Sequence, residues 1–129
     1  MRERYFENNF VEIWFENGII YQTFKLNTNL TLESAKKVVK DRIQVSNNTT
    51  TPICIDIRNL VSADLKAHKF MASKEAVQFI SAGAFIVNNV INRMLMNLFS
   101  KVFKPVVPAA SFTNVDEAIQ WLEKYKYLN

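Results

Sequence analysis

The residues of this 129-residue chain that could take part in chemistry gather around the end of one short apolar run, residues 52–57. Asp56 lies near the end of this run, Arg58 and Asn59 follow it directly, and Ser62 and Asp64 come shortly after them. Turns at the carboxyl ends of buried strands are where α/β proteins place ligands and switches. A carboxylate, a guanidinium and an amide can bind a polar ligand, but without a nucleophile and a base they are not a catalytic set. We therefore take these five residues as a candidate ligand or switch loop, and we expect a protein without enzymatic activity.

Two interpretations stay open for this loop. Asp56 either accepts hydrogen bonds from backbone amides of the following turn or lines a pocket at the edge of the sheet. Ser62 and Asp64 have the pattern of a helix start, where their oxygens would cap backbone N–H groups, worth about 1 kcal/mol. The functional alternative is phosphorylation of Ser62, because a phosphate is favourable near a helix N-terminus, although Asp64 would repel it.

The remaining reactive side chains occur singly. Cys54 is the only cysteine and lies within an apolar run, so we expect a buried and inert thiol. His68 is the only histidine, and we expect it on the surface of a helix or half buried there. A single cysteine cannot form a disulfide within the chain, and one histidine alone makes a poor metal site. We therefore expect no metal and no cofactor.

Length and composition indicate one domain over residues 1–129, because a 49% hydrophobic content is ample for a single core. The net charge of +4 and pI of about 9.3 come from lysines and arginines spread along the chain. Nucleic-acid binders gather such residues on one face, so we expect no nucleic-acid partner.

The charged N-terminus is no secretory signal, and no run has the eighteen apolar residues of a membrane span. We expect a cytoplasmic protein.

The order of elements predicts an α/β fold. Asn17-Gly18 between two β-rich runs, 10–15 and 19–24, predicts a hairpin, since both turn residues tolerate positive φ. A helix follows Thr31 with Leu32, Ala35, Val39, Arg42 and Ile43 on its inner face. The further expected elements are strand 52–57, a helix after Asp64, strand 82–87, helix 90–103, edge strand 106–112 and a last helix after a capping box at 113–116. The order β-β-α-β-α-β-α-β-α favours a mixed, mostly parallel sheet covered by helices.

The expected helix at 90–103 is apolar nearly all round. Met96, Phe99 and Phe103 form a second apolar stripe beside the one that would face the core. A helix of this kind is buried on more than one side. Either another part of the chain covers the second stripe, or it is the interface of a homodimer or a partner protein, or it contacts an apolar ligand or a membrane. We take these three residues as the candidate interface and expect a homodimer.

Four phrases, WFENGIIYQTF, ICIDIRNL, KFMASKEAV and DEAIQWL, resemble those of small bacterial proteins with a SpoIIAA-like fold, related to the STAS domain. The resemblance covers nearly the whole chain. It implies a non-enzymatic switch that docks on a regulatory protein partner, which in this class phosphorylates a Ser or Thr at the start of the helix after the third strand. The Asp-Ser-Ser-Gly type motif of that switch is missing here, and Ser62 is the nearest hydroxyl.

The resemblance leaves two hypotheses. The first is a non-enzymatic protein-interaction or regulatory module. The second rests on the likeness of SpoIIAA-like folds to the CRAL-TRIO lipid carriers. It is a binder or carrier of a small apolar ligand or lipid in a pocket between the sheet and the helices. We expect such a pocket to be lined by Phe70, Met71, Phe79, Met94 and Leu98.

Overall fold

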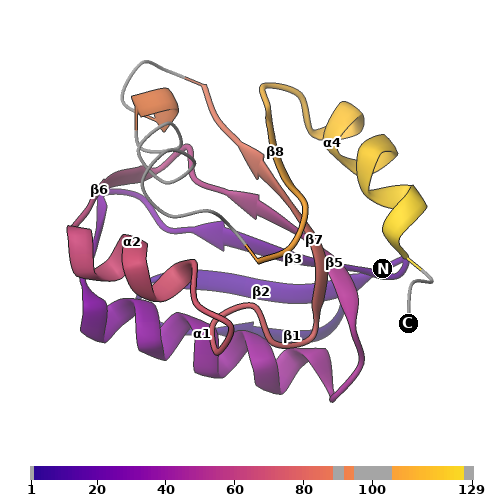
Figure 1. Ribbon diagram of the computed structural model, residues 1–129, viewed down its shortest axis with the longest axis horizontal. Coiled ribbons are helices and arrows are strands. Elements are labelled where there is room, and N and C mark those ends of the chain that lie inside the picture. The colour runs from indigo at the N-terminus through magenta and orange to yellow at the C-terminus, as the bar shows by residue number, and fades with distance from the viewer. Residues whose placement is uncertain (1, 89–91, 95–105, 127–129) are drawn as a thin grey trace.

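A six-stranded mixed sheet forms the centre of the molecule (Figure 1). The computed structural model describes residues 2–88, 92–94 and 106–126. In the order β1-β2-β3-β5-β7-β8, the strands are Glu3–Glu7, Val11–Glu16, Ile19–Phe24, Thr51–Asp56, Ile80–Ile86 and Ala109–Phe112. The pairs β1/β2 and β2/β3 are antiparallel, whereas β3/β5, β5/β7 and β7/β8 are parallel. The expected mixed, mostly parallel sheet is therefore confirmed.

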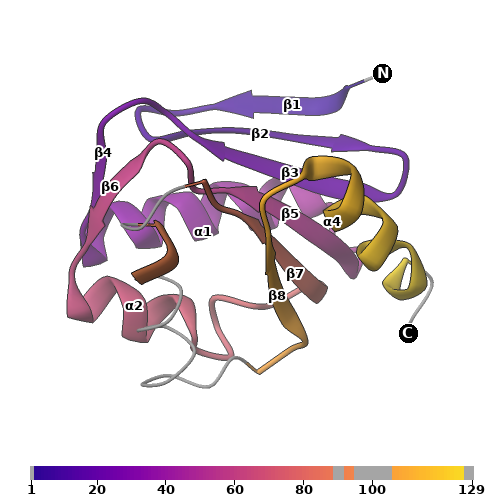
Figure 2. The same cartoon turned by 90° about the horizontal axis from the view of Figure 1, so that it is seen from above.

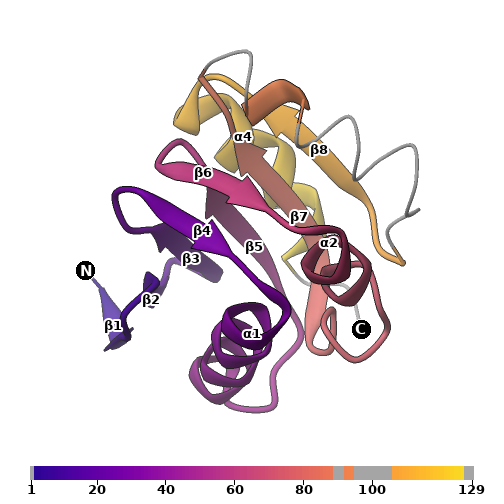
Figure 3. The same ribbon diagram turned by 90° about the vertical axis from the view of Figure 1, so that its left-hand side faces the viewer.

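Helices cover both faces of this sheet (Figures 2 and 3). Helix α1 (Leu32–Ser46) and helix α2 (Leu65–Met71) lie on one face, and helix α4 (Val115–Leu122) lies on the other with the short turn η1 (Glu123–Tyr125). The core is split accordingly into two apolar clusters. The larger one joins α1 and α2 to the sheet, and the smaller one joins α4 to β5 and β7. Within the described residues, no helix is both long and apolar enough to span a bilayer.

The predicted hairpin is confirmed. Asn17 has φ 50° and Gly18 has φ 81°, so both central residues of the turn lie in the left-handed region. The strands then pair without a bulge from Glu16 opposite Ile19 to Val11 opposite Phe24. The turn thereby fixes which side chains of β3 face α1.

Helix α1 begins as the sequence predicts. The Thr31 side chain accepts a hydrogen bond from the Ser34 backbone N–H at 3.2 Å, and the Ser34 hydroxyl accepts one from the Thr31 N–H at 2.8 Å. This reciprocal pair is a capping box. The helix ends at Asn47, whose φ of 53° is the left-handed conformation that commonly stops a helix.

Three strands are additions to the expected order. Strand β1 extends the hairpin, and β4 (Thr28–Leu30) pairs in parallel with β6 (Leu60–Ala63) in a separate two-stranded sheet. Neither β4 nor β6 has an alternating apolar pattern in the sequence, so neither was expected as a strand. Each forms only a short ladder with a distant segment. Ser62 therefore lies within a strand, and its expected place at a helix start is wrong.

Two further expectations need correction at the C-terminal end. The last helix is capped by Asn114 and not by Thr113, because the Asn114 side chain accepts the Glu117 N–H at 3.1 Å. The edge strand begins at Ala109, after Pro108, whose ring nitrogen cannot donate to a ladder. Of the expected helix at 90–103, residues 92–94 are helical, and the remainder, including Met96, Phe99 and Phe103, lies outside the described residues.

Replacing Gly18 by alanine tests the hairpin turn. An L-residue with a Cβ costs about 1–2 kcal/mol in the left-handed region, so Gly18→Ala should lower the free energy of unfolding by roughly 1 kcal/mol in urea titrations. Asn17→Gly is the matched control and should change stability by less than about 0.5 kcal/mol. Equal stability of Gly18→Ala and the wild type would contradict this turn geometry.

Candidate functional site

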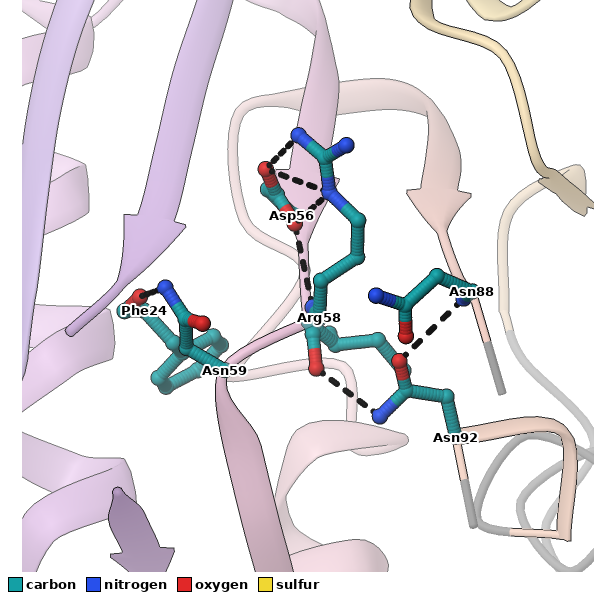
Figure 4. A network of polar contacts seen from close by, with 7 residues as sticks. Phe24, Asp56, Arg58, Asn59, Asn88 and Asn92 are labelled. Atoms are coloured by element: carbon teal, nitrogen blue, oxygen red, sulfur yellow. Dashed lines mark hydrogen bonds and ion pairs between the residues drawn. The ribbon is translucent and has the colours of Figure 1, made fainter. Parts of the chain in front are cut away.

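The candidate loop begins with an ion pair at the end of β5 (Figure 4). Arg58 Nη2 lies 2.7 Å from Asp56 Oδ2, and Arg58 Nε lies 3.0 Å from Asp56 Oδ1. The Arg58 backbone N–H also donates to Asp56 Oδ1 at 3.0 Å, as expected for a carboxylate satisfied by the next turn. The ion pair raises the pKa of Arg58. Asp56 and Arg58 are thus bound to each other.

Two asparagines fix the rest of this turn (Figure 4). Asn59 Nδ2 donates to the Phe24 carbonyl at 3.4 Å, which ties the turn to the end of β3. Asn92 Nδ2 donates to the Ile57 carbonyl at 3.0 Å, and Asn92 Oδ1 accepts the Asn88 N–H at 3.3 Å. Asn92 is fully buried. This residue was not predicted from the sequence, because Asn92 lies among other polar residues, between Asn89 and Arg93, and nothing in the pattern marks it as buried.

Ser62 lies in β6 and Asp64 directly follows this strand, and both have their own partners. Ser62 Oγ lies 2.7 Å from Asn29 Oδ1 on the neighbouring strand. Asp64 Oδ1 accepts the Ala67 N–H at 2.7 Å, which confirms Asp64 as the N-cap of α2. The Asp64 N–H donates to the Leu30 carbonyl at 3.0 Å. The hydrogen bonds of Asp56, Arg58 and Asn59, and those of Ser62 and Asp64, therefore fix the conformation of the segment after β5. Neither group of residues provides an activated nucleophile.

The two single reactive residues are both buried. Burial raises the pKa of Cys54 to about 12, so the thiol stays protonated at neutral pH, as expected for an inert cysteine. His68 is only 6% exposed, which corrects its expected place at or near the surface. Burial lowers the pKa of His68, and the charge of Asp64 opposes this effect. No group of potential metal ligands occurs within the described residues.

A cavity of about 100 Å³ lies between the sheet and the α1/α2 layer. Its lining is mostly apolar and comes from β3, β5, β7, both helices and the segment before β8. The apolar lining includes Phe24, Leu30, Val39, Ile53, Ile55, Ile57, Leu60, Met71, Val77, Ile80, Phe85 and Val107. Of the expected lining residues, Met71 is confirmed, whereas Phe70 and Phe79 are not part of the lining. Met94 is 63% exposed, and Leu98 lies outside the described residues.

Three polar residues complete the lining of this cavity: Gln22, Arg42 and His68. Gln22 is only 2% exposed and stands opposite Ile13 on β2 and Ile55 on β5. Its side-chain amide makes no hydrogen bond to any residue that the structure describes. Because buried amides are almost always hydrogen-bonded, a bound molecule could supply the partner that the Gln22 amide lacks.

Arg42 places a cation in the same wall. It is 1% exposed, and its guanidinium donates to the carbonyls of Ala76, at 2.6 Å, and Gln78. Among the described residues, no carboxylate forms an ion pair with it. Burial lowers the pKa of Arg42 to about 10, which leaves it charged at neutral pH. A guanidinium has five N–H donors, so the two backbone carbonyls satisfy only some of the donors of Arg42.

Asn92 should matter more for stability than the Asp56–Arg58 pair. Asn92→Ala removes the donor to a buried turn carbonyl, and we expect a loss of about 1–3 kcal/mol of unfolding free energy. Arg58→Ala removes an exposed ion pair, and we expect a loss below about 1 kcal/mol. Urea unfolding of both variants measures the difference. The reverse order of the two losses would show that the ion pair, and not Asn92, holds the turn.

His68 should make stability depend on pH. Because its folded-state pKa lies below the unfolded value of about 6.5, the unfolded chain takes up the proton first as pH falls, and stability is lost below that pH. His68→Gln should therefore lose less stability than the wild type between about pH 7 and pH 5. Parallel pH profiles of the two proteins, measured by urea unfolding, would contradict a depressed pKa.

Comparison with known proteins agrees with this architecture. A solved structure of an uncharacterized protein of the DUF3478 family from Shewanella loihica PV-4, described as having a SpoIIAA-like fold, is similar to the chain. Its TM-score is 0.57 at 16% identity, over 91% of this chain and 98% of that chain, which confirms the expected SpoIIAA-like fold. No curated protein matches the sequence. The family model described as "Domain of unknown function (DUF7793)" matches residues 13–126, and the chain therefore belongs to this family.

Proposed function

We propose that this protein is a non-enzymatic binding protein that holds a small, mainly apolar ligand in the cavity between the sheet and the α1/α2 layer. The observation that carries the proposal is Gln22, an amide buried to 98% without a described hydrogen-bond partner in an apolar cavity. Such a group costs about 1–3 kcal/mol unless something pairs with it. A ligand with one polar group would supply the missing hydrogen bond.

The polar residues of the lining also indicate the class of ligand. Arg42 carries a buried positive charge without a described carboxylate, and buried charges are normally paired. The neutral His68 and the Gln22 amide can donate or accept a hydrogen bond. A small carboxylic acid with an apolar body fits this combination, because its carboxylate meets the donors and its body meets the apolar walls.

The size of the cavity limits the ligand. Its volume of about 100 Å³ is somewhat smaller than the roughly 150 Å³ of an engineered apolar cavity that accepts benzene. A molecule with a short alkyl chain or a single ring is therefore the expected occupant, and a long-chain lipid is not.

Melting temperatures with a panel of ligands test this proposal. Short-chain and aromatic carboxylates should raise the melting temperature by several degrees at saturation, because binding at 100 times Kd adds about 2.7 kcal/mol. The corresponding hydrocarbons should bind at least about tenfold more weakly, since they offer no hydrogen bond to the Gln22 amide and no negative charge to Arg42. The absence of any shift across the panel would contradict the proposal.

Gln22→Leu provides the matched variant. It removes the buried amide while keeping a similar volume, so we expect the protein without ligand to be at least as stable as the wild type. The preference for carboxylates over hydrocarbons should shrink in this variant. Gln120→Leu, a change on the exposed side of α4, is the control and should keep the preference. A Gln22→Leu protein that is clearly less stable would show that the amide already has a partner.

Docking on another protein, as STAS domains do, is the second candidate function. The groove between α1 and α2 described below favours it. The expected homodimer through Met96, Phe99 and Phe103 stays a prediction, because these residues lie outside the described ones. The cytoplasmic location also stays a prediction.

A further inference from the structure

A second hollow lies between α1 and α2. The two helices run side by side in the same direction (Figures 1 and 3), and the groove between them has a volume of about 790 Å³. Leu32, Val39, Ile43 and Phe70 provide the apolar part of its lining. Leu32, Ile43 and Phe70 are only half buried by the chain itself. The groove therefore offers apolar surface that a second molecule could cover.

Four exposed lysines line the same groove. Lys36 and Lys40 come from one helix, and Lys66 and Lys69 from the other. Among the described residues, none of the four forms an ion pair with a carboxylate. Other lysines do so: Lys25 pairs with Glu7, Lys37 with Asp41 and Lys126 with Glu123.

The described part of the chain therefore does not balance the charge of the groove. Glu75 is the one acidic residue in the lining, so the side chains add four positive charges and one negative. Like charges gathered around one hollow repel each other and attract an acidic partner.

We propose that this groove is a docking site for an acidic amphipathic helix of a partner protein. Two parallel helices form a channel into which a third helix can lay its apolar face. The two lysines of α1 are four residues apart, and the two lysines of α2 are three residues apart. Acidic residues on one face of a docked helix would have the same spacing. Acidic residues on both edges of the docked helix would meet the two lysine pairs.

A membrane surface fits the groove less well. The apolar lining residues are buried or half buried, whereas the four lysines are exposed, so a flat anionic bilayer would meet the lysines first. A helix is narrow enough to enter. This inference is independent of the proposed ligand, because the groove and the cavity are separate hollows.

Selection from a displayed library of random 16-residue peptides tests the proposal. We expect wild-type protein to enrich peptides with apolar residues at helical spacing and several Asp or Glu residues, with micromolar Kd. Binding should weaken at least about tenfold in the folded variant Lys40→Glu/Lys69→Glu, and also on raising the salt concentration. The control Arg2→Glu/Lys124→Glu makes the same charge change at exposed residues outside the groove lining, and should alter Kd less than about twofold.

Several results would overturn the proposal. These are failure to enrich any peptide, enrichment without an acidic bias, and equal weakening in both double variants. The second part of the experiment measures binding of the protein to vesicles that contain phosphatidylserine. Vesicle binding that depends on Lys40 and Lys69, together with no peptide binding, would assign the groove to a membrane surface and reject the peptide. Circular dichroism and cooperative urea unfolding establish that both variants are folded.

Discussion

The buried guanidinium of Arg42 holds α1 against the turn before β7, and the arrangement of the whole α1/α2 layer depends on this contact. It donates to the carbonyls of Ala76 and Gln78, which belong to the segment that connects α2 to β7. The preceding residue, Asp41, points to a different side of α1 and accepts hydrogen bonds from Asn8 at 2.7 Å and Lys37 at 3.2 Å. Two adjacent charges thus fix the helix from two directions. Burying them costs several kcal/mol per ion unless both are well bonded, so the helix has little freedom to shift.

This fixed layer separates two hollows of opposite character. The cavity on its inner side is apolar with a few buried polar groups, and the groove between α1 and α2 is wide and lined by lysines. Val39 contributes to the lining of both. Because the same two helices bound the cavity and the groove, a movement of α2 relative to α1 would change both of them. The polar turn after β5, by contrast, is closed by its own hydrogen bonds.

Local chemistry explains what could be predicted from the sequence. The Asn17-Gly18 turn and the Thr31 cap act within a few residues, so their patterns are visible in the chain itself. The pairing of β4 with β6 is different, because Asn29 and Ser62 lie 33 residues apart in the sequence, with α1 and β5 between them. The inward stripe of α1 did include Arg42, yet periodicity alone could not show that no carboxylate of the described residues pairs with it. Gln22 had a similar signal, since it alternates with Ile20 and Phe24 on β3.

The position of Ser62 changes how phosphorylation there would act. A phosphate at a helix N-terminus is stabilised by free N–H groups and by the helix dipole. Here Ser62 lies in β6, and the carboxylate of Asp64 already accepts the N–H of Ala67 at the start of α2. A phosphate on Ser62 would instead replace the hydroxyl that contacts Asn29 across the β4/β6 pair. Its effect would therefore be to loosen a two-stranded sheet beside α2, through lost pairing and not through attraction to a helix end.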